Sequence, residues 1–169
     1  MMTGIINKLL AGAMVIVIVI VAITIFSPGG RKAAQRNVQR TTDTETIIAT
    51  VEQIQEQKKS DSFPEDLTST LSDLDQQSGT VQMILRKPAT DFDCRTTCGV
   101  QVIARENCTV DFSTIPREIL NKVPLDPSRD PAVGVTGYYI NSANGVLTVG
   151  ACEPEQEPNG RTPEILVTR

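Results

Sequence analysis

One stretch of the sequence limits what this chain can be more than any other. Residues 9–26 are all apolar or small, and none of them is charged. Such a run extends about 27 Å as a helix, close to the roughly 30 Å of a bilayer's hydrocarbon core. We therefore expect a transmembrane helix over residues 9–26, preceded by a short leader, residues 1–8.

The main alternative for this stretch is a cleaved secretory signal, because Lys8 gives it a short basic flank. The apolar region of a signal is usually shorter, however, and no small-x-small cleavage site is clear after Phe26. A buried strand fits less well, since strands rarely run so long.

The charges on either side of the apolar run and the cysteines give opposite orientations. Lys8 is the one basic residue before the run, and four follow it closely: Arg31, Lys32, Arg36 and Arg40. The positive-inside rule would place the C-terminal side in the cytoplasm. Disulfides, in contrast, persist outside it. We follow the cysteines and expect a single-pass protein of the cytoplasmic (inner) membrane with an extracytoplasmic head.

The cysteines are four in number, which predicts a disulfide framework with three possible connectivities. We favour Cys94 with Cys98 and Cys108 with Cys152. A four-cysteine zinc site is the alternative, but it lacks the usual two-residue spacing within each pair. A redox role for Cys94 and Cys98 is weaker again, because three residues separate them instead of two.

The composition argues against enzymatic chemistry. Histidine is absent, which removes the commonest general base and rules out a Ser-His-Asp triad. A net charge of -4 and a pI near 4.9 give no electrostatic footprint for nucleic acid. We predict no enzyme activity, no catalytic residues, no cofactor, no nucleic-acid partner and no small-molecule substrate.

Residues 126–130 place oxygens where calcium could use them, although their proline and arginine favour a plain turn.

The rest of the chain divides into a stalk, a head and a tail. Residues 31–59 predict an amphipathic stalk helix, because its apolar positions follow the spacing of one helix face: Ile47, Ile48, Val51 and Ile54. Residues 60–152 form the disulfide-bearing α+β head, and residues 153–169 a polar, loosely ordered tail with an edge strand near residues 165–167.

Within the head we expect short strands and two short helical segments. Strands are predicted at residues 81–85, 99–103, 137–141 and 145–150, and helical segments at residues 64–74 and 115–123. Asn144-Gly145 between two strand-like runs is the strongest hairpin signal in the chain. The predicted fold class is α+β, a long N-terminal helix with a membrane half and an amphipathic half, packed on a small antiparallel β-sheet.

This order of parts resembles the type IV pilin and type II secretion pseudopilin superfamily. Residues 31–43 resemble its Arg/Ala-rich helix with an Arg-x-x-Asp step, and residues 47–51 the Ile-rich stretch that follows. Residues 123–127 resemble its Pro-x-Asp-Pro segment, residues 137–140 its Gly-Tyr-Tyr strand, and residues 144–150 its Asn-Gly strand-turn-strand. The resemblance touches about two thirds of the chain.

The resemblance implies a pilin-like fold and a structural role. The chain would be a membrane-anchored subunit that self-associates, with other pilin-like subunits, into a pilus-like or pseudopilus filament at the cell surface. Its N-terminus departs from the family pattern: Gly4 precedes Ile5, but Leu9 stands where the family has a glutamate. The alternative function is a single-pass membrane protein whose outer domain binds a ligand or partner.

Overall fold

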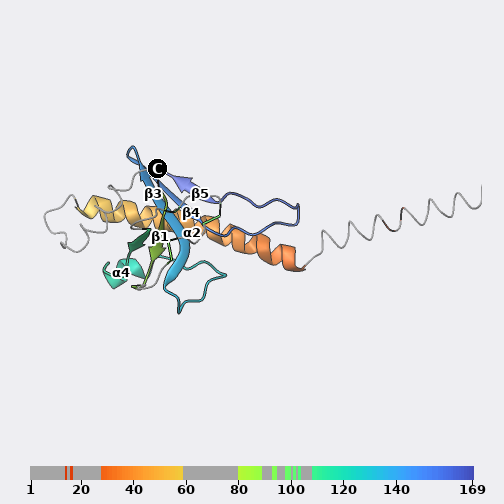
Figure 1. The fold of residues 1–169 in the computed structure, drawn as a ribbon, viewed down its shortest axis with the longest axis horizontal. Coiled ribbons are helices and arrows are strands. Elements are labelled where there is room, and N and C mark those ends of the chain that lie inside the picture. Colours follow the sequence, from red (N-terminus) through yellow and green to blue (C-terminus); the bar gives the residue numbers. More distant parts are fainter. Residues whose placement is uncertain are drawn as a thin grey trace, which may run out of the picture.

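The computed structural model describes residues 14, 16, 28–58, 80–88, 93–94, 98–99, 101, 103 and 108–169. In this part a long helix, α2 (Pro28–Lys58), lies against a five-stranded sheet, with a short helix, α4 (Arg117–Leu120), beside it (Figure 1). The strands are β1 (Gln82–Leu85), β2 (Thr109–Asp111), β3 (Val135–Ala143), β4 (Val146–Ala151) and β5 (Leu166–Thr168).

The sheet is mixed and has the strand order β2-β1-β3-β4-β5. β1 pairs with β2 in parallel, and the other neighbours pair antiparallel. The prediction of an antiparallel sheet is therefore wrong. Residues 86–108 connect β1 to β2, and a connection of that length allows the chain to cross back and enter β2 in the same direction.

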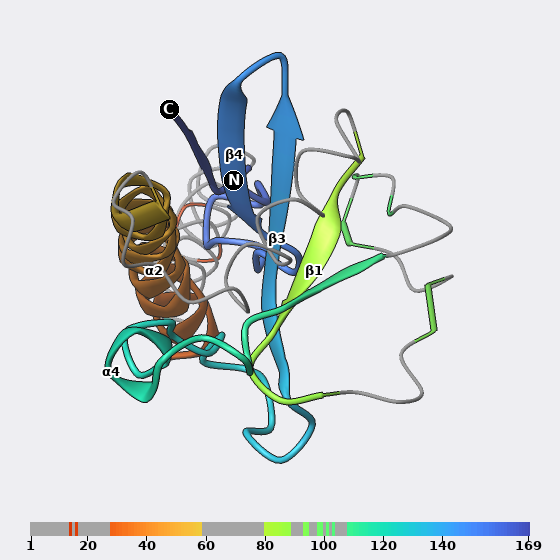
Figure 2. The same ribbon diagram turned by 90° about the vertical axis from the view of Figure 1, so that its left-hand side faces the viewer.

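The stalk helix is close to its predicted bounds. It begins at Pro28 instead of residue 31, because proline is well tolerated in the first turn, where its missing N–H has no helical partner. Its apolar stripe faces the sheet, as expected: Ile47, Ile48, Val51 and Ile54 are buried. α2 contacts β4 and β5, so it covers this end of the sheet (Figure 2).

The predicted fold class is also wrong about the membrane half of the long helix. Within the described residues, no helix is long and apolar enough to cross a membrane. α2 is polar on average, since amide, hydroxyl and charged side chains outnumber its apolar residues. Met14 and Ile16 are helical and exposed, and the rest of residues 9–26 lie outside the described part, as does the predicted helical segment at residues 64–74.

The sheet separates two apolar cores. The larger lies between the sheet and both helices and includes Ile84, Phe112 and Tyr138. The smaller lies on the opposite face and includes Met83, Tyr139 and all four cysteines, of which Cys94 is only partly buried. Tyr138 and Tyr139 belong to different cores because successive side chains of a strand point to opposite faces.

Several strand predictions are confirmed. Residues 81–85, 137–141, 145–150 and 165–167 correspond to β1, β3, β4 and β5. Asn144 and Gly145 form the turn between β3 and β4 with positive φ angles of 53° and 78°, as a type I′ hairpin requires.

The remaining predictions need correction. In residues 99–103 the described positions form only isolated bridges, Val81 with Ile103 and Cys98 with Gln101. The helix expected over residues 115–123 is reduced to α4, one turn long. β2 was not predicted, because a three-residue strand leaves little alternation to detect.

Gly150 provides a test of the packing between β3 and β4. It pairs with Tyr139, and a Cβ at Gly150 would lie 2.3 Å from the ring carbon Cζ. We expect Gly150→Ala to lower the free energy of unfolding by about 1–3 kcal/mol, because an overpacked core must shift. Urea unfolding of the full chain in detergent measures this.

Gly29→Ala is the matched control for this change. A Cβ there meets no atom within 4 Å. Alanine should keep or slightly raise stability at this helical position. Equal unfolding midpoints for the two variants would contradict the close packing of Tyr139 on Gly150.

Candidate functional site

The most distinctive polar cluster in the described residues joins the stalk helix to the head. We call it the polar joint and define it by these residues: Arg36, Asn37, Arg40, Asp43, Asp126, Ser128, Tyr138 and Glu155. The first four lie on one face of α2, because residues three and four apart are neighbours on a helix. The others come from the turn after α4, from β3 and from the C-terminal tail.

Arg40 is the centre of the joint, and its side chain is fully buried. Its Nε donates to Asp126 Oδ2 at 2.6 Å and its Nη2 to Asp126 Oδ1 at 3.0 Å. Further donations go to Asn37 Oδ1 at 2.9 Å, Ser128 Oγ at 2.8 Å and Glu155 Oε1 at 3.0 Å. Burial by itself lowers the pKa of Arg40, but the bonds to Asp126 and Glu155 outweigh it and raise that pKa. The guanidinium therefore stays charged.

The turn after α4 is shaped to present Asp126. The Asp126 N–H donates to Thr136 O at 2.8 Å, and Asp126 Oδ1 accepts the N–H of Ser128 at 2.8 Å. Gly137 has a φ of 85°, and a Cβ there would lie 2.6 Å from Asp126 Cβ. Glycine at 137 thus lets β3 pass close beside the carboxylate that receives Arg40.

Tyr138 extends the joint into the larger core. Its hydroxyl donates to Asp43 Oδ2 at 2.6 Å, and both residues are buried. Burial raises the pKa of Asp43, while the hydrogen bond from Tyr138 partly offsets that effect. Burial, the bond to Asp43 and the Asp43 charge all raise the pKa of Tyr138. The phenol is therefore a permanent donor at neutral pH.

The tail is held by α2, contrary to the prediction that it is loosely ordered. Asn37 donates to the Glu155 carbonyl at 2.8 Å and accepts the Glu155 N–H at 3.0 Å. Arg36 Nε donates to Glu155 Oε1 at 2.6 Å, and Arg36 Nη2 pairs with Oε2. The hydrogen bond from Arg36 is the largest of the effects that lower the pKa of Glu155 to about 2.

All four cysteines form disulfides, as predicted, but the favoured pairing is wrong. The bridges are Cys94–Cys108, with Cα atoms 5.5 Å apart, and Cys98–Cys152, with Cα atoms 4.4 Å apart. The sequence left three connectivities open, and the fold decides among them. Cys108 directly precedes β2 and Cys152 directly follows β4, so the two cannot meet across the strands between them.

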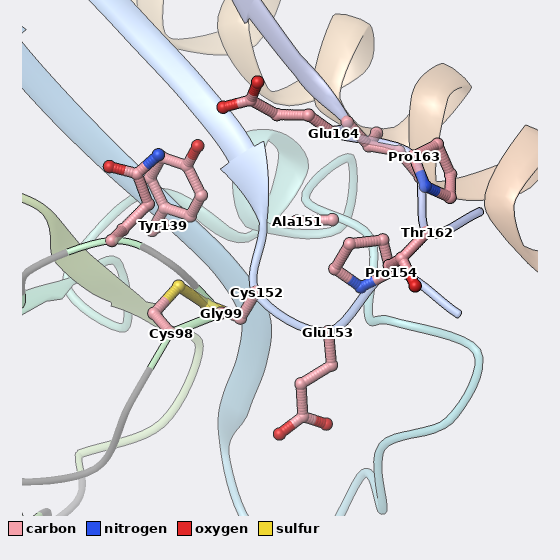
Figure 3. A pocket seen from close by; sticks show the side chains of 12 residues that line it. Cys98, Gly99, Tyr139, Ala151, Cys152, Glu153, Pro154, Thr162, Pro163 and Glu164 are labelled. Carbon is pink, nitrogen blue, oxygen red and sulfur yellow. A yellow bond between two sulfur atoms is a disulfide. The ribbon is translucent and has the colours of Figure 1, made fainter. Parts of the chain in front are cut away.

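Next to the Cys98–Cys152 bridge the surface is hollowed into a cleft of about 500 Å³ (Figure 3). Among the residues that line it are Tyr139, Glu153, Pro154, Thr162, Pro163 and Glu164. Tyr139 places the cleft on the sheet face opposite α2, where the smaller core lies. No sequence pattern indicated the cleft, since its walls come from segments far apart in the chain.

The calcium alternative at residues 126–130 does not fit the geometry. Asp126 is occupied by Arg40, and Asp130 Oδ1 accepts the N–H of Ala132 at 2.9 Å. In the described part of the chain, no group of three or more acidic or cysteine side chains is placed to hold a metal ion. The bonds from Asp126 to the Ser128 N–H and from Asp130 to the Ala132 N–H are those of a plain turn.

No family model matches this chain, and no curated protein or solved structure matches it. The geometry of the joint and the cleft therefore carries the functional argument.

The Arg40–Asp126 pair should be essential for the joint. We expect Arg40→Met to cost roughly 3–5 kcal/mol of unfolding free energy, because it leaves the Asp126 carboxylate buried without its cation. Arg40→Met with Asp126→Asn should recover part of that loss. Urea unfolding measures both, and Arg161→Met, at an exposed position, is the control. A loss for Arg40→Met no larger than the control's would refute this role.

The Glu155 carboxylate should make the tail's attachment sensitive to acid. Its pKa in the folded chain lies near 2, below its ordinary value near 4.5. A lowered pKa stabilises the fold above the ordinary value, and this contribution is lost as the pH falls from about 4.5 towards 2. Unfolding measured across this window should show the loss, and Glu155→Gln should reduce it. An unchanged pH profile in Glu155→Gln would contradict the assignment.

Proposed function

We propose that this chain is a structural subunit of a filament of the type IV pilin or pseudopilin type, held at the cytoplasmic membrane before assembly, with its head outside the cytoplasm. The polar joint is the observation that carries the proposal. It fastens a 31-residue helix to the head through buried, charge-assisted bonds.

The joint supports the family resemblance because it unites the segments on which that resemblance rests. The Arg-x-x-Asp step supplies Arg40 and Asp43, the Pro-x-Asp-Pro segment supplies Asp126, and the Gly-Tyr-Tyr strand supplies Gly137 and Tyr138. These segments lie far apart in the sequence but meet at hydrogen-bond distance. Together these segments fix the helix on the sheet.

A long helix fixed to the head in this way suits a filament subunit, in which the helix carries the head. At 1.5 Å per residue, α2 is about 46 Å long. Figure 1 shows the first part of α2 extending beyond the strands of the sheet. Val38 in this part is 68% exposed, so its side chain is accessible to a neighbouring chain.

The sequence before α2 offers the cohesion that a filament needs. Residues 9–26 are apolar, and Ala11, Gly12 and Ala13 would allow neighbouring chains to approach closely. Leu9 occupies the position of the family's glutamate, so apolar packing would replace charge pairing at that point. The two disulfides support an extracytoplasmic head, because such bridges persist in oxidising compartments.

The cleft favours a second candidate, a membrane-anchored module that binds a partner with its outer domain. Its volume of about 500 Å³ is within the usual range for ligand sites. Assembly state separates the two candidates. A filament subunit forms high-order assemblies, whereas an anchored module stays monomeric until its partner is added.

Charge in the apolar run should abolish both membrane retention and assembly. We expect Val17→Asp to move the chain out of the membrane fraction and to remove the high-order species, because a carboxylate in such a run is costly to bury. Membrane flotation and sedimentation of solubilised assemblies measure the two effects. Val133→Asp, at a position 58% exposed, is the matched control and should change neither.

Two results would count against the proposal. Normal retention of Val17→Asp would show that the apolar run does not hold the chain. A wild-type chain that is retained but always monomeric would favour the anchored module.

A further inference from the structure

We propose that the cleft beside the Cys98–Cys152 bridge receives the lysine side chain of a second copy of this chain, Lys32 at the projecting end of α2. This inference rests on the proposed filament and names a contact within it. The cleft offers a carboxylate and apolar walls, which suit an ammonium group on an aliphatic stem.

The described lining of the cleft is acidic. It includes Glu153 and Glu164 and contains no lysine or arginine. Glu153 is already compensated, because Arg129 Nη2 lies 2.8 Å from its Oε1. In Figure 3 the Glu153 carboxylate points away from the cleft, and the Glu164 carboxylate extends towards the side where Tyr139 lies. Among the described residues, Glu164 has no ion-pair partner.

The negative charge of Glu164 acts on Tyr139, which lines the cleft. Burial is the largest cause of the raised pKa of Tyr139, and the negative charge of Glu164 is the next. Pro154 and Pro163 give the walls apolar surface. An incoming lysine would lay its stem along these walls and bring its ammonium to Glu164.

The chain already uses pairing of this kind within one molecule. Lys32, Arg36 and Arg40 follow one another at intervals of four residues, and the two arginines bind Glu155 of the tail. Lys32 is one turn earlier, exposed, and without an ion-pair partner in the described part of the chain. Arg36 and Arg40 are neutralised by Glu155 and Asp126, so Lys32 is the exposed cation of this series.

We assign the lysine to another copy because of the side of the sheet on which Glu164 and Tyr139 meet. On β3, Tyr138 points to α2 and Tyr139 points to the cleft, so Tyr139 lies on the sheet face opposite the helix of the same molecule.

Carbodiimide cross-linking tests the contact directly. The reagent joins a lysine amine to a carboxylate as an amide, with loss of water, only where the two groups touch. Assemblies formed in membranes from mixed ¹⁴N and ¹⁵N chains should give a Lys32–Glu164 peptide that carries both labels. A peptide that joins only like-labelled chains, or assemblies without this peptide, would overturn the inference.

Charge reversal provides the second measurement. We expect Lys32→Glu and Glu164→Lys each to reduce the assembled fraction about fivefold or more, because like charges then face each other. The double variant should restore assembly. Glu118→Lys and Lys122→Glu, at exposed positions on and after α4, are the matched controls and should assemble normally.

The outcomes distinguish this inference from the proposed function. Wild-type assemblies that persist in both single variants would overturn the contact and leave the filament intact. A double variant that remains as impaired as the single ones would overturn the pairing of Lys32 with Glu164. A wild-type chain that forms no assemblies would overturn the filament and this contact together.

Discussion

The fold depends on the buried pair between Arg40 and Asp126. A guanidinium without exposure loses its hydration, and only full pairing makes its burial tolerable. Asp126 supplies two of the bonds, and Asn37, Ser128 and Glu155 supply the others. The helix, the turn after α4 and the tail are therefore held by one side chain, and none of them can move without leaving a charge unpaired.

The sequence predicted the elements of the fold better than their connections. The apolar spacing of α2 and the Asn144-Gly145 turn are local signals, and the structure confirms both. Strand direction and disulfide pairing are not local, because they depend on contacts between segments that lie far apart in the sequence. The membrane half of the long helix was expected from the apolar run alone, and no described helix bears it out.

The candidate site was visible in the sequence only as separate motifs. Arg40, Asp43, Asp126 and Tyr138 each belong to a segment that the family resemblance selected. Nothing in their spacing states that they touch, since contact requires the sheet to bring residues 86 positions apart to within 2.6 Å. Asn37 lies in the first of these segments but outside its Arg-x-x-Asp step, and Glu155 lies outside all of them. Asn37 acts through bonds to the tail backbone, and side chain to main chain contacts of this kind leave no pattern in the sequence.

An ionic joint gives this fold something that apolar packing alone does not. Apolar contacts are non-directional, so the short stripe from Ile47 to Ile54 defines the position of α2 on the sheet less sharply than directed bonds do. A shift by one turn would move the helix about 5.4 Å. Such a shift would break the bonds of Arg40 with Asp126 and of Asp43 with Tyr138. The joint therefore selects one register, and every copy carries its head in the same orientation on the helix. A filament of identical subunits requires that uniformity, because a repeated contact between copies closes only when each copy presents the same surface.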